Sequence, residues 1–467
     1  MATMINTVNK ETYLKVPTHS KPLNQDRIAQ LLAKEWETFK NSTAGSGLEN
    51  VEAAKTMPLG VASSFQHWDP YPLHIKSAKG AWMTDMDGRK LIDYSMGFGA
   101  MLVGHLHPVV MAKVKAAMEF GTMFVTPAPQ TRSAADALCA RFDLDQIRFT
   151  NSGTESTMYA IRTAKAATEK RGVVKVEGGY HGSYDPLTCS VKPSLEDAGP
   201  ADNPTLFVPP ATEPGELYVV PYNNADALEK VFKEHADTIA CFVVEPVLEN
   251  IAIVLPDAGY LERVRELCTE YNVILIFDEV KTGLTAGPQG ASQRLGVKPD
   301  LITLAKSIGG GLPVAAFGGR KDLMDSISNH TFMHFGTFNG NPLSMAAVMA
   351  VDEICTKETM QAAEDLNNYI LNSIFDIIEK HELPAHVVGF GVKGCVTWAT
   401  TPVRNYRDYK ATDFHIAELS WLWSMNRGVI TPPGLDEQWL VSLAHGKAEA
   451  DQLIENYRSL AEALRAE

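Results

Sequence analysis

The chain has 467 residues, 45% of them apolar and 21% charged, and its 42 basic residues against 56 acidic residues give a net charge of −14. This composition is typical of a folded globular protein and excludes disordered, collagen-like and disulfide-scaffold chains. An acidic chain offers no basic surface to a phosphate backbone, so we expect no nucleic-acid partner.

The length exceeds that of one usual hydrophobic core, which predicts more than one domain. We expect an N-terminal segment over 1–80, a large domain over 81–345 and a small C-terminal α+β domain over 346–467. No apolar run approaches the ~18 residues that cross a bilayer, and the N-terminus has no signal core. With six cysteines and no CxxC pair, the chain is expected to be cytoplasmic, with reduced thiols and no membrane contact.

In chain order, the first helical pattern covers Arg27–Phe39. The small polar residues of Asn41–Gly47 then predict a flexible loop. Residues 81–94 alternate in polarity around an Asp-Gly pair, which predicts a β-hairpin.

From about residue 130 to 320, short apolar strands alternate with helical stretches such as Glu155–Glu169 and Gly259–Tyr271. The expected strands are Ile147–Thr150, Val173–Glu177, Ile239–Glu245, Val273–Asp278, Leu301–Ala305 and Ala315–Gly318. This alternation predicts an α/β fold, in which helices cover both faces of a largely parallel sheet and ligands bind at the carboxyl ends of its strands. The C-terminal part is expected to contain helices over Pro342–Thr356, Thr359–His381 and Ala448–Arg465 and a strand over Gly394–Ala399.

Two of the expected strands end at charged residues that suit one cofactor. Asp278 ends one apolar strand, and Lys306 follows another, just before the glycines at 309–311. A desolvated lysine has a lowered amine pKa and can form a Schiff base, and a neighbouring carboxylate can keep a pyridine nitrogen protonated. The pair therefore indicates pyridoxal phosphate. The alternative is that Asp278 caps a helix and Lys306 is an ordinary surface lysine.

A phosphate site is predicted where Ser152, Gly153 and Thr154 join a strand to a helix, because helix N-termini bind anions. A plain helix cap is the alternative. Tyr180 and His181 lie on a glycine-flanked turn, where an aromatic ring can stack on a cofactor or simply complete the turn. The chain has neither a P-loop nor a dinucleotide glycine pattern, and its histidines lack the spacing of a metal site, so no metal is expected.

Taken together, these motifs resemble those of the class-III aminotransferases among the fold-type-I pyridoxal-phosphate enzymes, in the branch that contains the glutamate-1-semialdehyde aminomutases. The resemblance covers about residues 57–465. Its further marks are Gly104–Pro108, Glu245–Val247, Phe277–Val280 and Gly336–Pro342. It implies a large, mostly parallel sheet domain with a smaller C-terminal α+β domain.

The resemblance also implies roles for individual residues. Lys306 would hold the cofactor as a Schiff base and move the substrate proton, and Asp278 would pair with the pyridinium nitrogen. The other residues implied to bind the cofactor are Ser152, Gly153, Thr154, Tyr180, His181, Glu245, Asn250 and Val280. Thr337 would reach the cofactor phosphate of a neighbouring subunit, which implies a homodimer with a shared active site.

The sequence departs from the aminomutase pattern where the substrate is bound. Gln66 occupies the position of a carboxylate-binding arginine, and the late loop over 430–434 has no arginine. Arg404, Arg407 and Arg427 are either replacements or surface residues. We therefore expect slow or absent glutamate-1-semialdehyde isomerisation. The primary prediction is a ping-pong aminotransferase that moves an amino group from an amine or amino acid to a keto acid or aldehyde. The alternative is an intramolecular aminomutase, or a racemase.

Overall fold

The computed structural model describes residues 12–432 and 438–466. At its centre is a seven-stranded sheet with the order β5-β11-β10-β9-β8-β6-β7. The strands are β5 (Gln146–Thr150), β6 (Gly172–Val176), β7 (Leu217–Val220), β8 (Ile239–Val244), β9 (Ile274–Asp278), β10 (Leu301–Leu304) and β11 (Ala315–Gly319). β11 runs antiparallel to both of its neighbours, β5 and β10, and the other strand pairs of this sheet are parallel. The predicted α/β class with a largely parallel sheet is confirmed.

The central strands alternate their side chains between two apolar layers. On β9, Ile274 and Ile276 face the layer that contains helix α5 (Gly153–Thr168), whereas Leu275 and Phe277 face the layer that contains α7 (Ala225–His235) and α8 (Tyr260–Glu270). Burial on both faces explains why β8 and β9 read as continuous apolar runs. The remaining helices of this half of the molecule are α3 (Pro108–Met118), α4 (Pro129–Phe142), α6 (Asp185–Thr188), α9 (Gly290–Leu295), α10 (Lys321–Ser328) and α11 (Pro342–Ile354).

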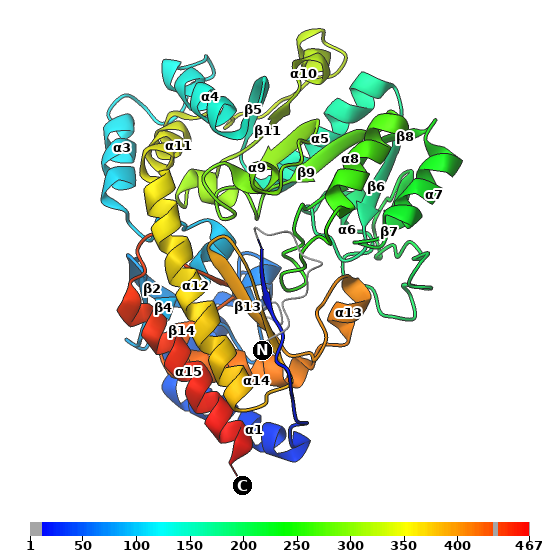
Figure 1. The fold of residues 1–467 in the computed structure, drawn as a ribbon. Coiled ribbons are helices and arrows are strands. Elements are labelled where there is room, and N and C mark those ends of the chain that lie inside the picture. Colours follow the sequence, from blue (N-terminus) through cyan, green and yellow to red (C-terminus); the bar gives the residue numbers. More distant parts are fainter. Residues whose placement is uncertain (1–11, 433–437, 467) are drawn as a thin grey trace.

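Two four-stranded sheets form the other half of the molecule (Figure 1). The first has the order β1-β12-β13-β15 and contains β1 (Tyr13–Lys15), β12 (His386–Phe390), β13 (Lys393–Thr397) and β15 (Trp439–Leu440). The second has the order β14-β4-β3-β2 and contains β2 (Ile75–Lys79), β3 (Trp82–Asp85), β4 (Lys90–Asp93) and β14 (Val429–Ile430). The predicted hairpin over 81–94 is therefore present as β3 and β4. It pairs with C-terminal β14, so segments far apart in the chain share one sheet.

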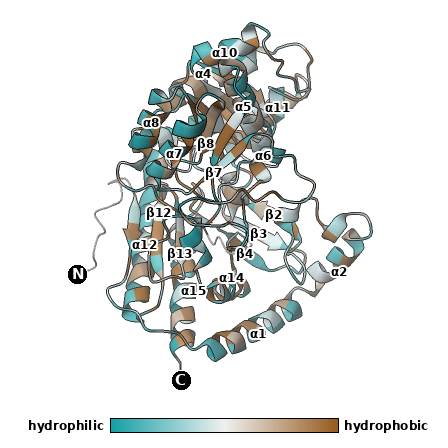
Figure 2. Cartoon of the chain, turned by 90° about the vertical axis from the view of Figure 1, so that its right-hand side faces the viewer, coloured by the Kyte–Doolittle hydropathy of each residue, from teal (hydrophilic) through white to brown (hydrophobic). Residues whose placement is uncertain are grey.

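Long helices pack around these smaller sheets. Helix α12 (Lys357–Lys380) lies beside α15 (Lys447–Arg465), and α1 (Gln25–Ser42) packs on α14 (Phe414–Asn426). In Figure 2, α1 runs along the lower edge of the molecule toward α2 (Ala44–Ala53). The short helix α13 (Tyr406–Lys410) completes the C-terminal part. None of the helices over 12–432 and 438–466 is long and apolar enough to cross a membrane.

The prediction of a flexible loop over Asn41–Gly47 is wrong. Helix α1 continues to Ser42 and α2 begins at Ala44. The reason is a distant carboxylate: Asp87, in the turn between β3 and β4, accepts hydrogen bonds from Gly45 N at 2.6 Å and Ser46 N at 3.1 Å. These bonds satisfy N–H groups that would otherwise be unpaired in the first turn of α2.

Candidate active site

A pocket of about 450 Å³ contains Asp278, from the end of β9, and Lys306, just after β10. The two strands are parallel neighbours, with Thr303 opposite Asp278, so both deliver side chains at the same sheet edge. The pocket brings together the predicted residues Ser152, Gly153, Thr154, Tyr180, His181, Glu245, Asn250, Asp278, Val280 and Lys306. Gln66 and Thr337 are the two predicted site residues outside this lining.

Asp278 is held by three hydrogen bonds. Its Oδ2 lies 2.7 Å from Nδ1 of His181, and its Oδ1 accepts from Thr303 Oγ1 at 2.9 Å and from Val280 N at 3.0 Å. Asp278 is only 3% exposed. The carboxylate is therefore fixed in orientation in the wall of the pocket. Nε2 of His181 is buried and has no partner among the described residues.

Lys306 begins a 3₁₀ turn over Lys306–Gly309 with a backbone φ of +48°. That left-handed conformation is uncommon for a residue other than glycine and is typical of strained functional positions. Burial, together with the nearby Lys281 and Lys393 cations, lowers the pKa of Lys306 to about 8. The amine is thus neutral far more often near neutral pH than that of an ordinary lysine, as a nucleophile requires.

The N-terminus of α5 forms a cradle suited to a phosphate. Ser152 is the N-cap, and its Oγ accepts from Glu155 N at 3.3 Å. A Cβ on Gly153 would lie 2.9 Å from a methyl group of Val280, so only glycine lets the start of α5 lie this close to the Val280 side chain. Thr154 Oγ1 accepts from Ser183 N at 3.1 Å, which leaves its hydroxyl hydrogen available to an anion. Backbone N–H groups, a hydroxyl and the helix dipole together favour an anion here.

Aromatic and polar groups line the pocket near Tyr180. The ring of Tyr180 makes an edge contact with Phe65, at 5.6 Å between ring centroids. Asn250 Nδ2 donates to Glu245 Oε1 at 2.8 Å, and Glu249 N donates to Glu245 Oε2 at 3.1 Å. Burial raises the pKa of Glu245. Glu245 thus orients Asn250 within the pocket.

The residues considered for substrate binding lie elsewhere. Gln66 is exposed at the end of a short turn and its Oε1 accepts from Ala62 N at 3.2 Å, while its neighbour Phe65 lines the pocket. Arg404 pairs with Asp257, Arg407 with Glu177 and Arg427 with Glu35. The late loop over 430–434 lies partly outside the described residues.

Thr337 is exposed on the loop before α11 and does not line the pocket of its own chain. Its role across a dimer stays a prediction.

Sequence reasoning missed several contributors to the site, of which three bear on its chemistry. Thr303 lies inside β10 and bonds Asp278, Phe98 lines the pocket, and Lys281 lines it as a second lysine. The signal for Lys281 was its position three residues after Asp278, at the same strand end.

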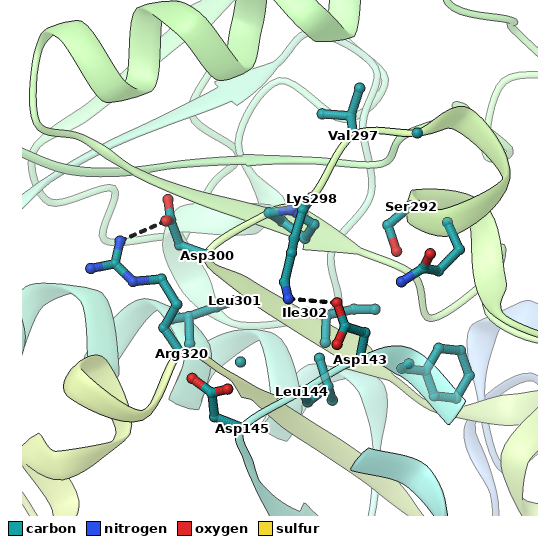
Figure 3. A pocket seen from close by; sticks show the side chains of 15 residues that line it. Asp143, Leu144, Asp145, Ser292, Val297, Lys298, Asp300, Leu301, Ile302 and Arg320 are labelled. Atoms are coloured by element: carbon teal, nitrogen blue, oxygen red, sulfur yellow. Dashed lines mark hydrogen bonds and ion pairs between the residues drawn. The ribbon is translucent and has the colours of Figure 1, made fainter. Parts of the chain in front are cut away.

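A second pocket, of about 200 Å³, lies at the opposite edge of the sheet, where β5 and β10 begin (Figure 3). Four of its charged groups form two ion pairs: Lys298 Nζ lies 2.6 Å from Asp143, and Arg320 lies 2.8 Å from Asp300. The carboxylate of Asp145 accepts from Lys321 N at 2.9 Å. We assign no chemistry to it. No cluster of metal-ligating side chains occurs anywhere in residues 12–432 and 438–466.

Comparison with known proteins identifies the family of this chain. Residues 64–412 match the family described as aminotransferase class-III. The chain belongs to that family.

A glutamate-1-semialdehyde 2,1-aminomutase from Methanocorpusculum labreanum is 37% identical over 412 residues, which cover 87% of this chain and 97% of that protein. A crystal structure of a glutamate-1-semialdehyde aminomutase from Pseudomonas aeruginosa with PMP matches with a TM-score of 0.87 at 24% identity, covering 95% and 99% of the two chains. An omega-transaminase from Sphaerobacter thermophilus matches with a TM-score of 0.86 at 27% identity, covering 90% and 98%.

These findings confirm the predicted family, the fold-type-I architecture and pyridoxal phosphate as the cofactor. The residues present fit that cofactor: a lysine of lowered pKa, a fixed carboxylate and an anion cradle face one pocket. The relatives favour the aminomutase, which is the alternative of the sequence prediction, over the two-substrate aminotransferase.

Proposed function

We propose that this protein uses pyridoxal phosphate to move an amino group on a small molecule, with glutamate-1-semialdehyde aminomutase as the first specific candidate. The observation that carries the proposal is that Lys306 and Asp278 lie at the ends of adjacent strands and line the same pocket. The identity of 37% to an aminomutase over 87% of the chain supports the specific candidate.

In this proposal each residue has a defined task. The cofactor, when bound, supplies an electron sink that stabilises negative charge at the substrate carbon. The Lys306 amine holds the cofactor between turnovers and carries the proton between carbon positions during turnover. Asp278 keeps the ring nitrogen protonated, and His181 and Thr303 hold its carboxylate in place.

The remaining residues would position the cofactor. Ser152, Gly153 and Thr154 would bind its phosphate, and Val280 and Tyr180 would pack against its two faces. Glu245 and Asn250 would lie beside the ring. Thr337 would come from the second subunit of a homodimer and contact the phosphate. All but Thr337 line the same pocket, which supports this arrangement.

The second candidate is a ping-pong aminotransferase acting on separate amine and keto acid substrates. The observation that favours it is the neutral Gln66, which bonds its own turn and brings no positive charge to the pocket. The structural match to an omega-transaminase supports this candidate as well.

One experiment separates the two candidates. The holoenzyme is incubated with excess glutamate-1-semialdehyde and no other amine or carbonyl compound. An aminomutase converts it over many turnovers to the isomer with the amino group on carbon 1. A strict aminotransferase takes the amino group from one molecule and releases the dicarbonyl, and it can pass that group only to the aldehyde of a second molecule, which gives a diamine and no isomer. Lys306→Ala is the control and should do neither. If the wild type exchanges no amino group with this substrate, or with a panel of amines and keto acids, the proposed function is wrong.

A further inference from the structure

Lys281 places a second positive charge in the pocket. Among the described residues that line it, Lys281 and Lys306 are the only lysines or arginines. Lys306 is committed to the cofactor under the proposed function, so its charge is not available to the substrate. Lys281 lies three residues after the end of β9 and also lines a small adjoining cavity with Lys393, Gln438 and Phe98.

The partner of the Lys281 ammonium group is a backbone carbonyl. Lys281 Nζ donates to Glu249 O. The carboxylate of Glu249 bonds Lys393 instead, with 2.5 Å between Lys393 Nζ and Glu249 Oε2, and both side chains are almost fully buried. Within 12–432 and 438–466, no carboxylate lies within ion-pair distance of Lys281, although its charge acts on the Glu245 carboxylate, which lines the same pocket. Two of its three N–H donors therefore remain for another acceptor.

The surrounding contacts fix the position of this lysine. Lys393 Nζ also donates to Lys281 O at 2.8 Å, and Gln438 Nε2 donates to Glu249 O at 2.6 Å. The backbone on both sides of Lys281 Nζ is thus tied to β13 and to the strand that follows Gln438. A cation held in this way presents its charge to the pocket at little entropic cost.

The other cations considered for the substrate are occupied. Arg404, Arg407 and Arg427 each form an ion pair with a carboxylate that does not line the pocket. Gln66 has no charge.

We propose that Lys281 binds a carboxylate group of the substrate and determines specificity for acidic amino compounds. This inference rests on the proposed function, because it concerns the substrate of the same pocket. It supplies, from a different strand end, the positive charge that Gln66 lacks. Both candidate reactions can use it, since either an aminomutase or an aminotransferase can act on an amino compound that carries a carboxylate.

The test compares two amine donors that differ only at the far end. 4-Aminobutyrate carries a carboxylate where butylamine carries a methyl group. For Lys281→Met we expect kcat/KM, or the single-turnover rate constant of the cofactor absorbance change, to fall about 10- to 100-fold for 4-aminobutyrate, which is the effect of losing one charged hydrogen bond. The loss should appear in KM. For butylamine, kcat/KM or the single-turnover rate constant should change less than threefold, apart from any factor by which the substitution slows both donors alike. The ratio of the values for the two donors therefore measures the loss of the carboxylate contact.

Two controls accompany this variant. Lys281→Arg should keep the preference for 4-aminobutyrate because it retains the charge. Lys298→Met removes an exposed lysine of the second pocket and should leave both donors unaffected. Removing the Lys281 charge also raises the pKa of Lys306, but this effect is common to both donors and cancels in their ratio.

A binding measurement makes the result independent of turnover. Butyrate should bind the wild-type holoenzyme, and its Kd by calorimetry should rise at least tenfold in Lys281→Met and stay unchanged in Lys298→Met. The inference is overturned if butyrate binds Lys281→Met as tightly as it binds Lys298→Met. It is also overturned if Lys281→Met lowers the rates of both donors by the same factor. If no donor reacts but butyrate binding depends on Lys281, the carboxylate site stands and the proposed function falls.

Discussion

Replacing Asp278 by asparagine tests the central electrostatic contact of the site. The substitution keeps the size of the side chain and removes its charge. One amide oxygen can still accept from Thr303 and Val280, as Asp278 Oδ1 does at 2.9 Å and 3.0 Å. The amide NH₂ then faces Nδ1 of His181, which can accept a hydrogen bond in its other neutral tautomer. The fold should therefore survive, with a loss of about 1 kcal/mol or less in the free energy of unfolding.

Catalysis should suffer far more than folding. An amide cannot hold the pyridinium proton by charge, so negative charge at the substrate carbon is less stabilised. Loss of one charge-assisted contact in this buried setting costs roughly 2–4 kcal/mol, or about 10²- to 10³-fold in rate. The assay is a single-turnover measurement of the cofactor absorbance change, with thermal unfolding recorded on the same sample. A variant that retains activity within threefold of wild type, with cofactor bound, would refute the role of Asp278.

Three further predictions concern the cofactor and the subunits. Gly153→Ala places a methyl group 2.9 Å from Val280. We therefore expect the affinity for the cofactor, measured by equilibrium titration, to fall about tenfold without loss of the fold. An unchanged affinity would contradict the assignment of the phosphate cradle to the start of α5. Because the pKa of Lys306 is lowered to about 8, its amine is protonated below that pH and neutral above it. The rate of cofactor incorporation into apoenzyme should therefore rise with pH with a midpoint near 8, and a pH-independent rate between 6 and 9 would oppose this. Finally, mixing inactive Lys306→Ala protein with an inactive Thr337 variant should restore part of the activity through hybrid dimers, whereas a fully active monomer would exclude a shared site.

Much of the fold could be predicted from local pattern. The continuous apolar runs of β8 and β9 indicate strands buried on both faces, and the structure has them there. Six strands of the described residues were not predicted, namely β1, β2, β7, β12, β14 and β15, and two of them show why. β2 is largely exposed and reads as a polar segment, and β7 has only four residues, with no helical pattern directly before it. In such cases pairing with a neighbouring strand, rather than the segment's own sequence, decides the structure.

Contacts between distant segments account for what the sequence could not predict in the site. Strand ends are local features, so Asp278 and Lys306 could be predicted. Whether an arginine is available to bind substrate depends on residues far away in the sequence. Arg407 is ion-paired with Glu177, which lies 230 positions away, and this ion pair removes Arg407 from substrate binding. The same reasoning applies to Lys281. Its position after the strand could be read from the sequence. That no carboxylate of the described residues forms an ion pair with Lys281, however, depends on Lys393, which engages Glu249 from β13. A search for substrate-binding cations therefore has to ask which charges remain uncompensated in the folded chain, and in this pocket that criterion selects a lysine where the sequence pattern directs attention to arginines.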